Sequence, residues 1–137
     1  MPSPTLHEAL IHLMVIMSAA DRDMTDSELA RIGNMIRTLP IFRGFDEQRI
    51  IEVAGQCQRI LQEEDGVERI LATVREVVPE KFHDTAYALA VEVAAADRHV
   101  EPEELRMLQI IRNRLQLEPL VAAAIERAAR ARNRRLV

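Results

Sequence analysis

An internal repeat constrains this chain more than any other feature of its sequence. Residues 19–29 read AADRDMTDSEL, and residues 95–105, 76 positions later, read AADRHVEPEEL. Six of the eleven positions are identical, and apolar residues also match at equal spacing on both sides of the two stretches. Self-similarity of this kind marks copies of one supersecondary unit. The sequence therefore predicts two copies of a helix–acidic turn–helix unit, at about residues 5–39 and 80–115.

Signals for the start of a helix follow both acidic turns. Thr25 and Glu28 have the spacing of a capping box, in which each side chain accepts a hydrogen bond from the other residue's backbone amide. Met24 and Leu29 have the spacing of a hydrophobic staple. In the second copy Pro102 stands where the first residue of a helix is expected. These signals predict helices that begin near residues 26 and 102.

Apolar residues recur at spacings of three and four through the rest of the chain, which is typical of amphipathic helices. They predict a first helix with Ser3 as its cap, two linker helices within about 46–78, and a C-terminal helix at about 119–132. Asp46 is expected to cap the first linker helix, and Gly66 to end it in the left-handed conformation. The helix predicted after residue 80 has few charges in its last turns, so we expect it to be the most buried.

The fold class that follows is all-α, a compact single-domain bundle of seven helices with an internal duplication. Hydrophobic residues make up 48% of the chain but aromatic residues only 3%, so the core must consist of aliphatic side chains. The single cysteine, Cys57, cannot form an internal disulfide, and we expect it to be a small buried hydrophobe in a protein of the cytoplasm. No signal peptide and no transmembrane segment are expected, although peripheral association with a membrane remains open.

Two copies of a helix–Ala-Ala-Asp–turn–Glu–helix unit, separated by two linker helices, resemble the TerB-like tellurite-resistance family over about residues 5–130. The resemblance implies a compact seven-helix fold, an association with the stress response to tellurite and other toxic agents, and a divalent-metal site among acidic residues. The family's usual motif reads Ala-Asp-Gly followed by a Glu, and Arg22 and Arg98 stand here in place of the glycine. Carried over by position, the implied metal ligands are Asp21, Glu28, Asp97 and Glu104.

Two interpretations of these acids are open. A hard cation such as calcium or magnesium prefers carboxylate oxygens from more than one segment, and a pseudo-two-fold arrangement of the turns would supply four. Asp23 would add an oxygen donor, whereas His99, at the equivalent position of the second copy, would favour a transition metal. Alternatively the acids cap backbone amides, and Arg22 or Arg98 pairs with them. Both interpretations require the two turns to lie close together.

The function expected from these patterns is that of a non-enzymatic stress-response domain that binds a divalent cation or a protein partner. The alternative is a helical protein-interaction module, with structural acids and an arginine-rich C-terminal helix as its working surface. Residues 118–137 carry a net charge of +3, whereas the rest of the chain carries −7. Arg127, Arg130 and Arg134 are expected to share one face of the helix, with Arg132 and Arg135 off that face.

Other candidate sites are weaker. His7 and His12 are five residues apart, so they do not share a helix face as a pair of metal ligands would. His83 is expected to pack or to cap a helix. Nucleic acid is not an expected partner, because aromatic side chains for base stacking are nearly absent. No nucleophile motif supports an enzyme, and metal-dependent hydrolysis would need an open coordination position beside the acids.

Overall fold

The computed structural model describes residues 4–19, 24–96 and 102–136, which form helices and connecting turns without a strand. The α-helices are α1 (Leu6–Ser18), α2 (Asp26–Thr38), α3 (Ile50–Leu61), α4 (Gly66–Val77), α5 (His83–Ala95), α6 (Pro102–Arg114) and α7 (Pro119–Arg132). Three short 3-10 helices are η1 (Pro40–Phe42), η2 (Glu47–Arg49) and η3 (Glu80–Phe82). The predicted all-α bundle is confirmed. The internal duplication remains a prediction, although each of its copies contains two helices of 13 residues.

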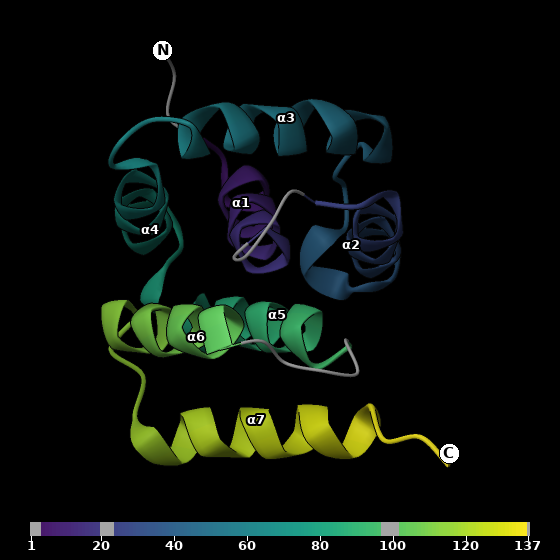
Figure 1. The fold of residues 1–137 in the computed structure, drawn as a ribbon, viewed down its shortest axis with the longest axis vertical. Helices are drawn as coiled ribbons and strands as arrows, with labels where there is room; N and C mark the ends of the chain where they lie inside the picture. Colours follow the sequence, from purple (N-terminus) through teal and green to yellow (C-terminus); the bar gives the residue numbers. More distant parts are fainter. Residues whose placement is uncertain (1–3, 20–23, 97–101, 137) are drawn as a thin grey trace.

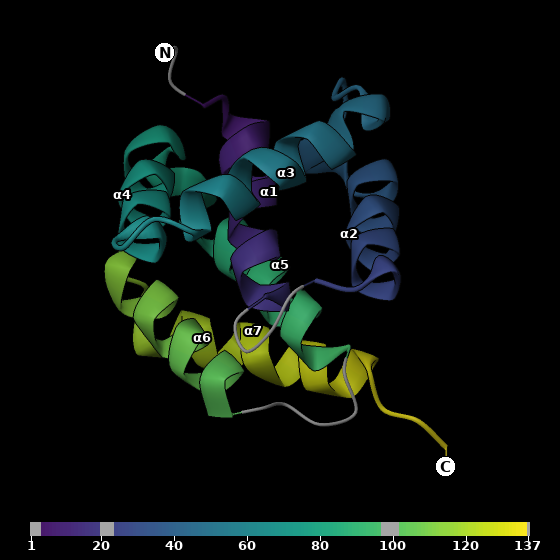
Figure 2. The same ribbon diagram turned by 45° about the horizontal axis from the view of Figure 1, so that its top comes forward.

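Helix α1 lies at the centre of the bundle. It packs against α2, α3, α4 and α5, which surround it in both ribbon views (Figures 1 and 2). Helix α5 packs against α1 on one side and against α7 on the other, so α7 forms an outer layer (Figure 1). Helix α6 also packs against α5. The three helices of the C-terminal part of the chain, α5 to α7, are thus neighbours in space.

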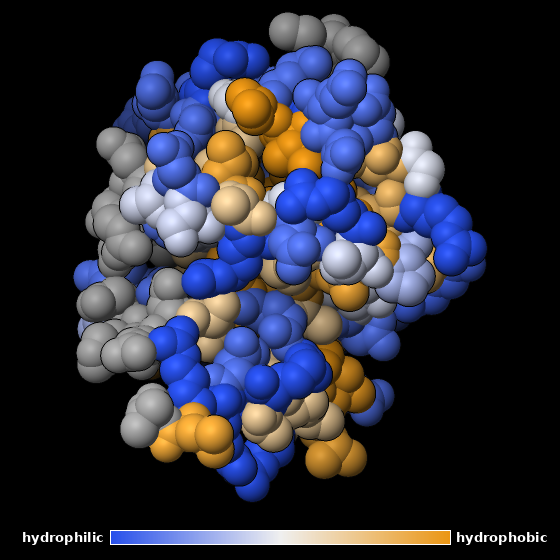
Figure 3. Space-filling model, turned by 90° about the vertical axis from the view of Figure 1, so that its right-hand side faces the viewer, coloured by the Kyte–Doolittle hydropathy of each residue, from blue (hydrophilic) through white to orange (hydrophobic). Residues whose placement is uncertain are grey.

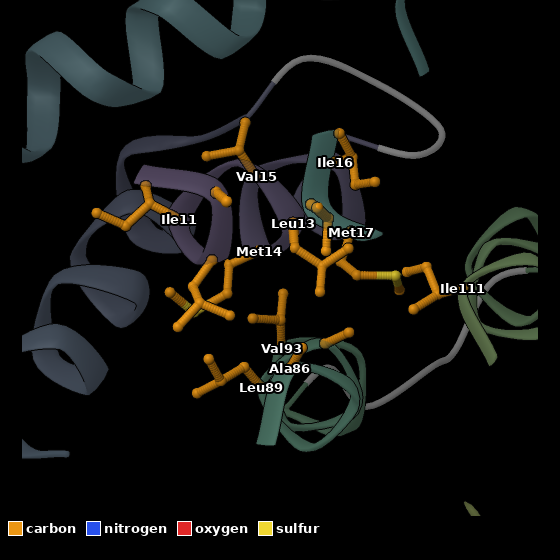
Figure 4. Packing of buried hydrophobic residues seen from close by; sticks show 14 of the residues in the cluster. Ile11, Leu13, Met14, Val15, Ile16, Met17, Ala86, Leu89, Val93 and Ile111 are labelled. Carbon is orange, nitrogen blue, oxygen red and sulfur yellow. The ribbon is translucent and has the colours of Figure 1, made fainter. Parts of the chain in front are cut away.

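The most buried helix is α1, and the expectation that this would be the helix after residue 80 is wrong. All ten residues from Ala9 to Ser18 are buried, whereas α5 has buried residues on part of its surface only. Figure 4 shows the contact between the two helices, in which side chains of α1 such as Leu13 and Met14 face Leu89 and Val93 of α5. A helix that is apolar nearly all round needs neighbours on every side, and the central position supplies them.

The start of α1 also differs from the prediction. The helix begins at Leu6 and its cap is Thr5, not the predicted Ser3, which lies outside the described residues. The Thr5 hydroxyl accepts a hydrogen bond from the Glu8 amide at 3.1 Å, and a Glu8 carboxylate oxygen accepts one from the Thr5 amide at 2.8 Å. This complete capping box satisfies the backbone amides of Thr5 and Glu8 at the start of the helix.

Gly66 does not end α3, as had been expected, but begins α4. A Cβ atom at this position would lie 2.2 Å from the carbonyl oxygen of Ile60 and 2.8 Å from the Cα atom of Leu61. Glycine is therefore required because two backbone segments approach closely, not because of a left-handed conformation. Among the described glycines only Gly44 has a positive φ, of 91°.

The surface is mainly hydrophilic on the face that Figure 3 shows, with hydrophobic residues in small groups between the charged ones. Four large hydrophobic side chains of the described residues are exposed: Ile51, Leu105, Leu120 and Leu136. Within the same residues, no helix has the length and apolar character that crossing a membrane requires.

Candidate functional site

The first of the two predicted acidic turns leads into α2 through the expected capping box. The Thr25 hydroxyl accepts a hydrogen bond from the Glu28 amide at 3.2 Å. Oε1 of Glu28 accepts one from the Thr25 amide at 3.2 Å and one from the Thr25 hydroxyl at 2.9 Å. Glu28 is only 6% exposed, which is unusual for a carboxylate. Met24 and Leu29, the predicted staple, are both partly buried against the core.

The second turn leads into α6, where Pro102 occupies the first helical position as predicted. Glu104 is the third residue of α6, as Glu28 is of α2, and it is 5% exposed. The structure thus describes two of the four predicted metal ligands, and it buries both at equivalent positions. The other two, Asp21 and Asp97, lie outside the described residues.

The neighbours expected to modify the site fall in the same two undescribed segments: Arg22, Asp23, Arg98 and His99. Within the ranges 4–19, 24–96 and 102–136, no three His, Cys, Asp or Glu side chains come together as a metal site would require. The predicted approach of the two turns therefore stays a prediction, as does the ligand set.

A second feature, which sequence reasoning did not find, is a groove between α5, α6 and α7. Its volume is about 770 Å³, within the range of small-molecule sites. One part of its wall is apolar and comes from α5 and α6: Val91, Ala94, Ala95, Leu105 and Leu108. The opposite part comes from α7 and the residues after it, and it includes Arg130, Asn133, Arg134 and Arg135. We call this feature the α7 groove.

A hydrogen-bonded network closes one end of the α7 groove. The Tyr87 hydroxyl donates to Oε2 of Glu126 at 2.6 Å, and Arg112 contacts the same oxygen at 3.2 Å. Burial, followed by the hydrogen bond to Glu126, raises the pKa of Tyr87 above its ordinary value. Tyr87 therefore remains a neutral phenol, and the charge of Glu126 is balanced by Arg112.

A second set of contacts fixes the end of α7 on α5. Arg132 forms an ion pair with Glu92, and the Asn133 side chain donates to the other Glu92 oxygen at 3.2 Å. The same Asn133 amide also donates to the carbonyl of Ala129 at 2.8 Å. Asn133 follows α7 directly, and the next two residues, Arg134 and Arg135, are exposed and line the groove.

The arginines of α7 divide differently from the prediction. Of the three arginines expected to share one face, Arg130 and Arg134 line the groove and the exposed Arg127 does not, whereas Arg135 also lines it. Extended to residue 135, helical spacing had predicted that Arg135 lies on a different helix face from Arg130 and Arg134. The helix ends at Arg132, however, so residues beyond it no longer follow the 3.6-residue period.

The remaining candidates have structural roles. His7 contacts the carbonyl oxygen of Ile41 at 2.8 Å and packs against the rings of Phe42 and Phe45. The His83 ring lies between two backbone carbonyls, at 2.9 Å from one and 3.3 Å from the other. Cys57 is fully buried, and burial raises its pKa to about 12. Its thiol thus stays protonated, in agreement with the expected role as a small hydrophobe.

We expect acid to destabilise the fold through His12, which is 4% exposed at the centre of the bundle. Burial lowers the pKa of His12, against the opposing charge of Glu8 and a hydrogen bond with the Val53 backbone. The unfolded chain, with an ordinary pKa of about 6.5, binds the proton more tightly. The contribution to stability is therefore present above about pH 6.5 and is lost as the pH falls through the folded-state pKa.

Urea unfolding at about pH 7.5 and about pH 5.5 measures this effect as a lower midpoint in acid. In His12→Gln, which does not titrate in this range, the difference between the two midpoints should shrink. An equal difference in both proteins would contradict the assignment to His12. The lowered pKa of Glu8, caused first by the hydrogen bond from the Thr5 backbone, acts in the same direction but only at lower pH.

These features define the class of protein: an all-α bundle that, in the described part of the chain, buries glutamates near the N-termini of α2 and α6 and has an arginine-lined groove. The sequence model of the family described as "Tellurite resistance protein TerB" matches residues 7–126. The chain therefore belongs to the TerB family, and the resemblance seen in its repeated turns is confirmed. No curated protein and no solved structure matched the chain.

Proposed function

We propose that this TerB-family chain is a stress-response domain of the tellurite-resistance kind, which acts in the cytoplasm by binding rather than by catalysis. In this proposal its ligand is a divalent cation such as calcium or magnesium, held by Asp21, Glu28, Asp97 and Glu104. The observation that carries the proposal is the burial of Glu28 and Glu104 at the same position of α2 and α6.

The chemistry of this donor set fits a hard dication, because four carboxylates from two segments supply only oxygen. A buried carboxylate is costly unless hydrogen bonds or a positive charge compensate it. The chain shows such compensation at two helix starts: Glu28 accepts hydrogen bonds from Thr25, and Glu8 of α1 combines its capping box with an ion pair to Arg49 at 2.8 Å. A bound cation would balance the negative charge of both acidic turns and would link α2 to α6.

Calorimetric titration of Ca²⁺, Mg²⁺, Mn²⁺ and Zn²⁺ into metal-free protein tests this proposal. We expect saturable binding of at least one ion, lost in Asp21→Asn/Asp97→Asn. The matched control is Asp65→Asn/Glu118→Gln, which removes two charges from exposed cap positions whose side chains make no capping hydrogen bond. Binding should survive in the control. Absence of heat with every ion would reject the cation.

A further variant separates capping from metal binding. Glutamine also serves in a capping box, so Glu28→Gln/Glu104→Gln keeps the cap at Thr25 but removes two charged ligands. The cation proposal expects weaker binding in this variant with only a small loss of stability. Unchanged binding would remove both glutamates from the ligand set.

The second candidate is the helical protein-interaction module, in which the acids are purely structural. It is favoured by the Thr25–Glu28 box, whose hydrogen bonds are complete in the protein alone. In this case α7, with its exposed arginines, would be the surface for a protein partner. Titrations without heat from any ion would favour this candidate.

A further inference from the structure

We propose that the α7 groove binds a small amphipathic anion: a free carboxylate with an acyl chain of medium length. The apolar wall would hold the acyl chain, and Arg130, Arg134 and Arg135 would hold the carboxylate. This inference is argued separately from the cation proposal: Glu28 and Glu104, the two proposed metal ligands among the described residues, do not line the groove.

The shape of the groove supports an elongated ligand. Each of its three helices contributes one face, with lining residues at spacings of three and four. On α5 they run from Tyr87 to Ala96, a length of about 13 Å at 1.5 Å per residue. Three consecutive alanines, 94 to 96, have small side chains and leave room in the groove on the side of α5. Leu105 of α6, another lining residue, is 58% exposed. An acyl chain lying there would cover apolar surface that now meets water.

The charge of the groove supports a negative head group. Among the described residues, four arginines and a single glutamate line it, although the whole chain carries a net charge of −4. Arg112 is engaged with Glu126. The remaining three, Arg130, Arg134 and Arg135, form no ion pair within the part of the chain that the structure describes. The attraction of a helix C-terminus for cations accounts for arginines near this end, but not for their placement around an apolar wall.

The two ends of the groove differ, and this difference orients the ligand. At one end Tyr87, Glu126 and Arg112 satisfy one another, so this end offers little to a second anion. At the other end the contacts with Glu92 fix Arg132 and Asn133 on α5, and the exposed Arg134 and Arg135 follow directly. Guanidinium groups pair well with a carboxylate, often through two parallel hydrogen bonds. The carboxylate therefore belongs at the end near residue 134.

The groove contains its own probe. Tyr87 is the only tyrosine of the chain, and there is no tryptophan. Because Tyr87 is fully buried and bonded to Glu126, tyrosine emission reports on that end of the groove. We expect sodium decanoate, kept below its micelle concentration, to change this emission in a saturable way and to bind with one-to-one stoichiometry in calorimetry.

The test variant is Arg130→Gln/Arg134→Gln/Arg135→Gln, which should weaken decanoate binding by about tenfold or more, since charge-assisted hydrogen bonds are the strong ones. The matched control is Arg43→Gln/Arg59→Gln/Arg75→Gln, which removes three exposed arginines distant from the groove. The control should bind as the wild type does. Leu105→Ser, at the exposed apolar residue, should also weaken binding and thereby report on the acyl chain.

Three further ligands distinguish other occupants. Decanol has the same acyl chain without charge, and inorganic phosphate is an anion without a chain; we expect both to bind at least about tenfold more weakly than decanoate. Vesicles of phosphatidylglycerol present the anion on a surface. Association with vesicles but not with decanoate would overturn the proposal in favour of a membrane surface. Equal binding of decanoate by the test variant and the wild type, or no binding at all, would also overturn it.

Discussion

Replacing Leu13 with alanine is expected to lower the free energy of unfolding by about 3–5 kcal/mol, the upper range for loss of a buried leucine side chain. Leu13 is fully buried in α1, the helix that packs against α2, α3, α4, α5 and α6, and Figure 4 shows it among other buried hydrophobic side chains. The side chains around it belong to several helices that also pack against one another, so they cannot easily move to fill the cavity. The full cost of the cavity is then added to the lost transfer free energy.

Urea unfolding measures this loss as a lower midpoint. Leu120→Ala is the matched control, because Leu120 is 80% exposed and the same atoms are removed from the surface. It should change the free energy of unfolding by no more than about 0.5 kcal/mol. Similar effects of the two substitutions would show that α1 is not the centre of the core.

Gly66→Ala is expected to destabilise the fold by about 2 kcal/mol or more, because inserted atoms in a tightly packed region force the backbone to move. The new methyl group would meet the carbonyl oxygen of Ile60 at 2.2 Å and the Cα atom of Leu61 at 2.8 Å. Both are backbone atoms, so no side chain can rotate away to relieve the contact. The connection between α3 and α4 would have to open.

Gly55→Ala provides a control of opposite sign. Gly55 lies inside α3, and a methyl group there would meet only Arg59, at an ordinary distance of 3.7 Å. Because alanine is the better helix former, this variant should be more stable by about 0.5–1 kcal/mol. Unfolding midpoints of the two variants, measured side by side, should therefore move in opposite directions. A stabilised Gly66→Ala protein would contradict the close approach of α3 and α4.

The helices could be predicted from the sequence because their signals are local. The capping box of Thr25 and Glu28 set the start of α2, and Pro40 after Leu39 its end. Errors arose where two local signals competed. Ser3-Pro4 and the pair of Thr5 and Glu8 both mark a helix start, and the complete capping box prevailed.

The α7 groove could not be predicted, because its walls depend on how distant helices pack. Tyr87 and Glu126 are 39 residues apart and meet only because α7 lies on α5. No single helix displays the groove, since each contributes a face that resembles an ordinary amphipathic surface. The burial of Glu28 and Glu104 could not be predicted from the sequence either. A capping-box motif predicts the hydrogen bonds of a glutamate but not the exposed fraction of its side chain.

The outer position of α7 has a consequence for the motions of the molecule. Of its side chains, only those of Ala122 and Ala129 are fully buried. Its polar contacts include the hydrogen bond of Asn133 to Glu92 of α5 and the ion pair of Glu126 with Arg112 of α6. Small buried side chains contribute little hydrophobic free energy, and Ile125 of α7 is only partly buried. We therefore expect detachment of α7 to cost less than unfolding α1 and to be one of the low-energy openings of the native state. Because detachment also removes one wall of the groove, any occupant of the groove must hold α7 in place, and the two equilibria are linked.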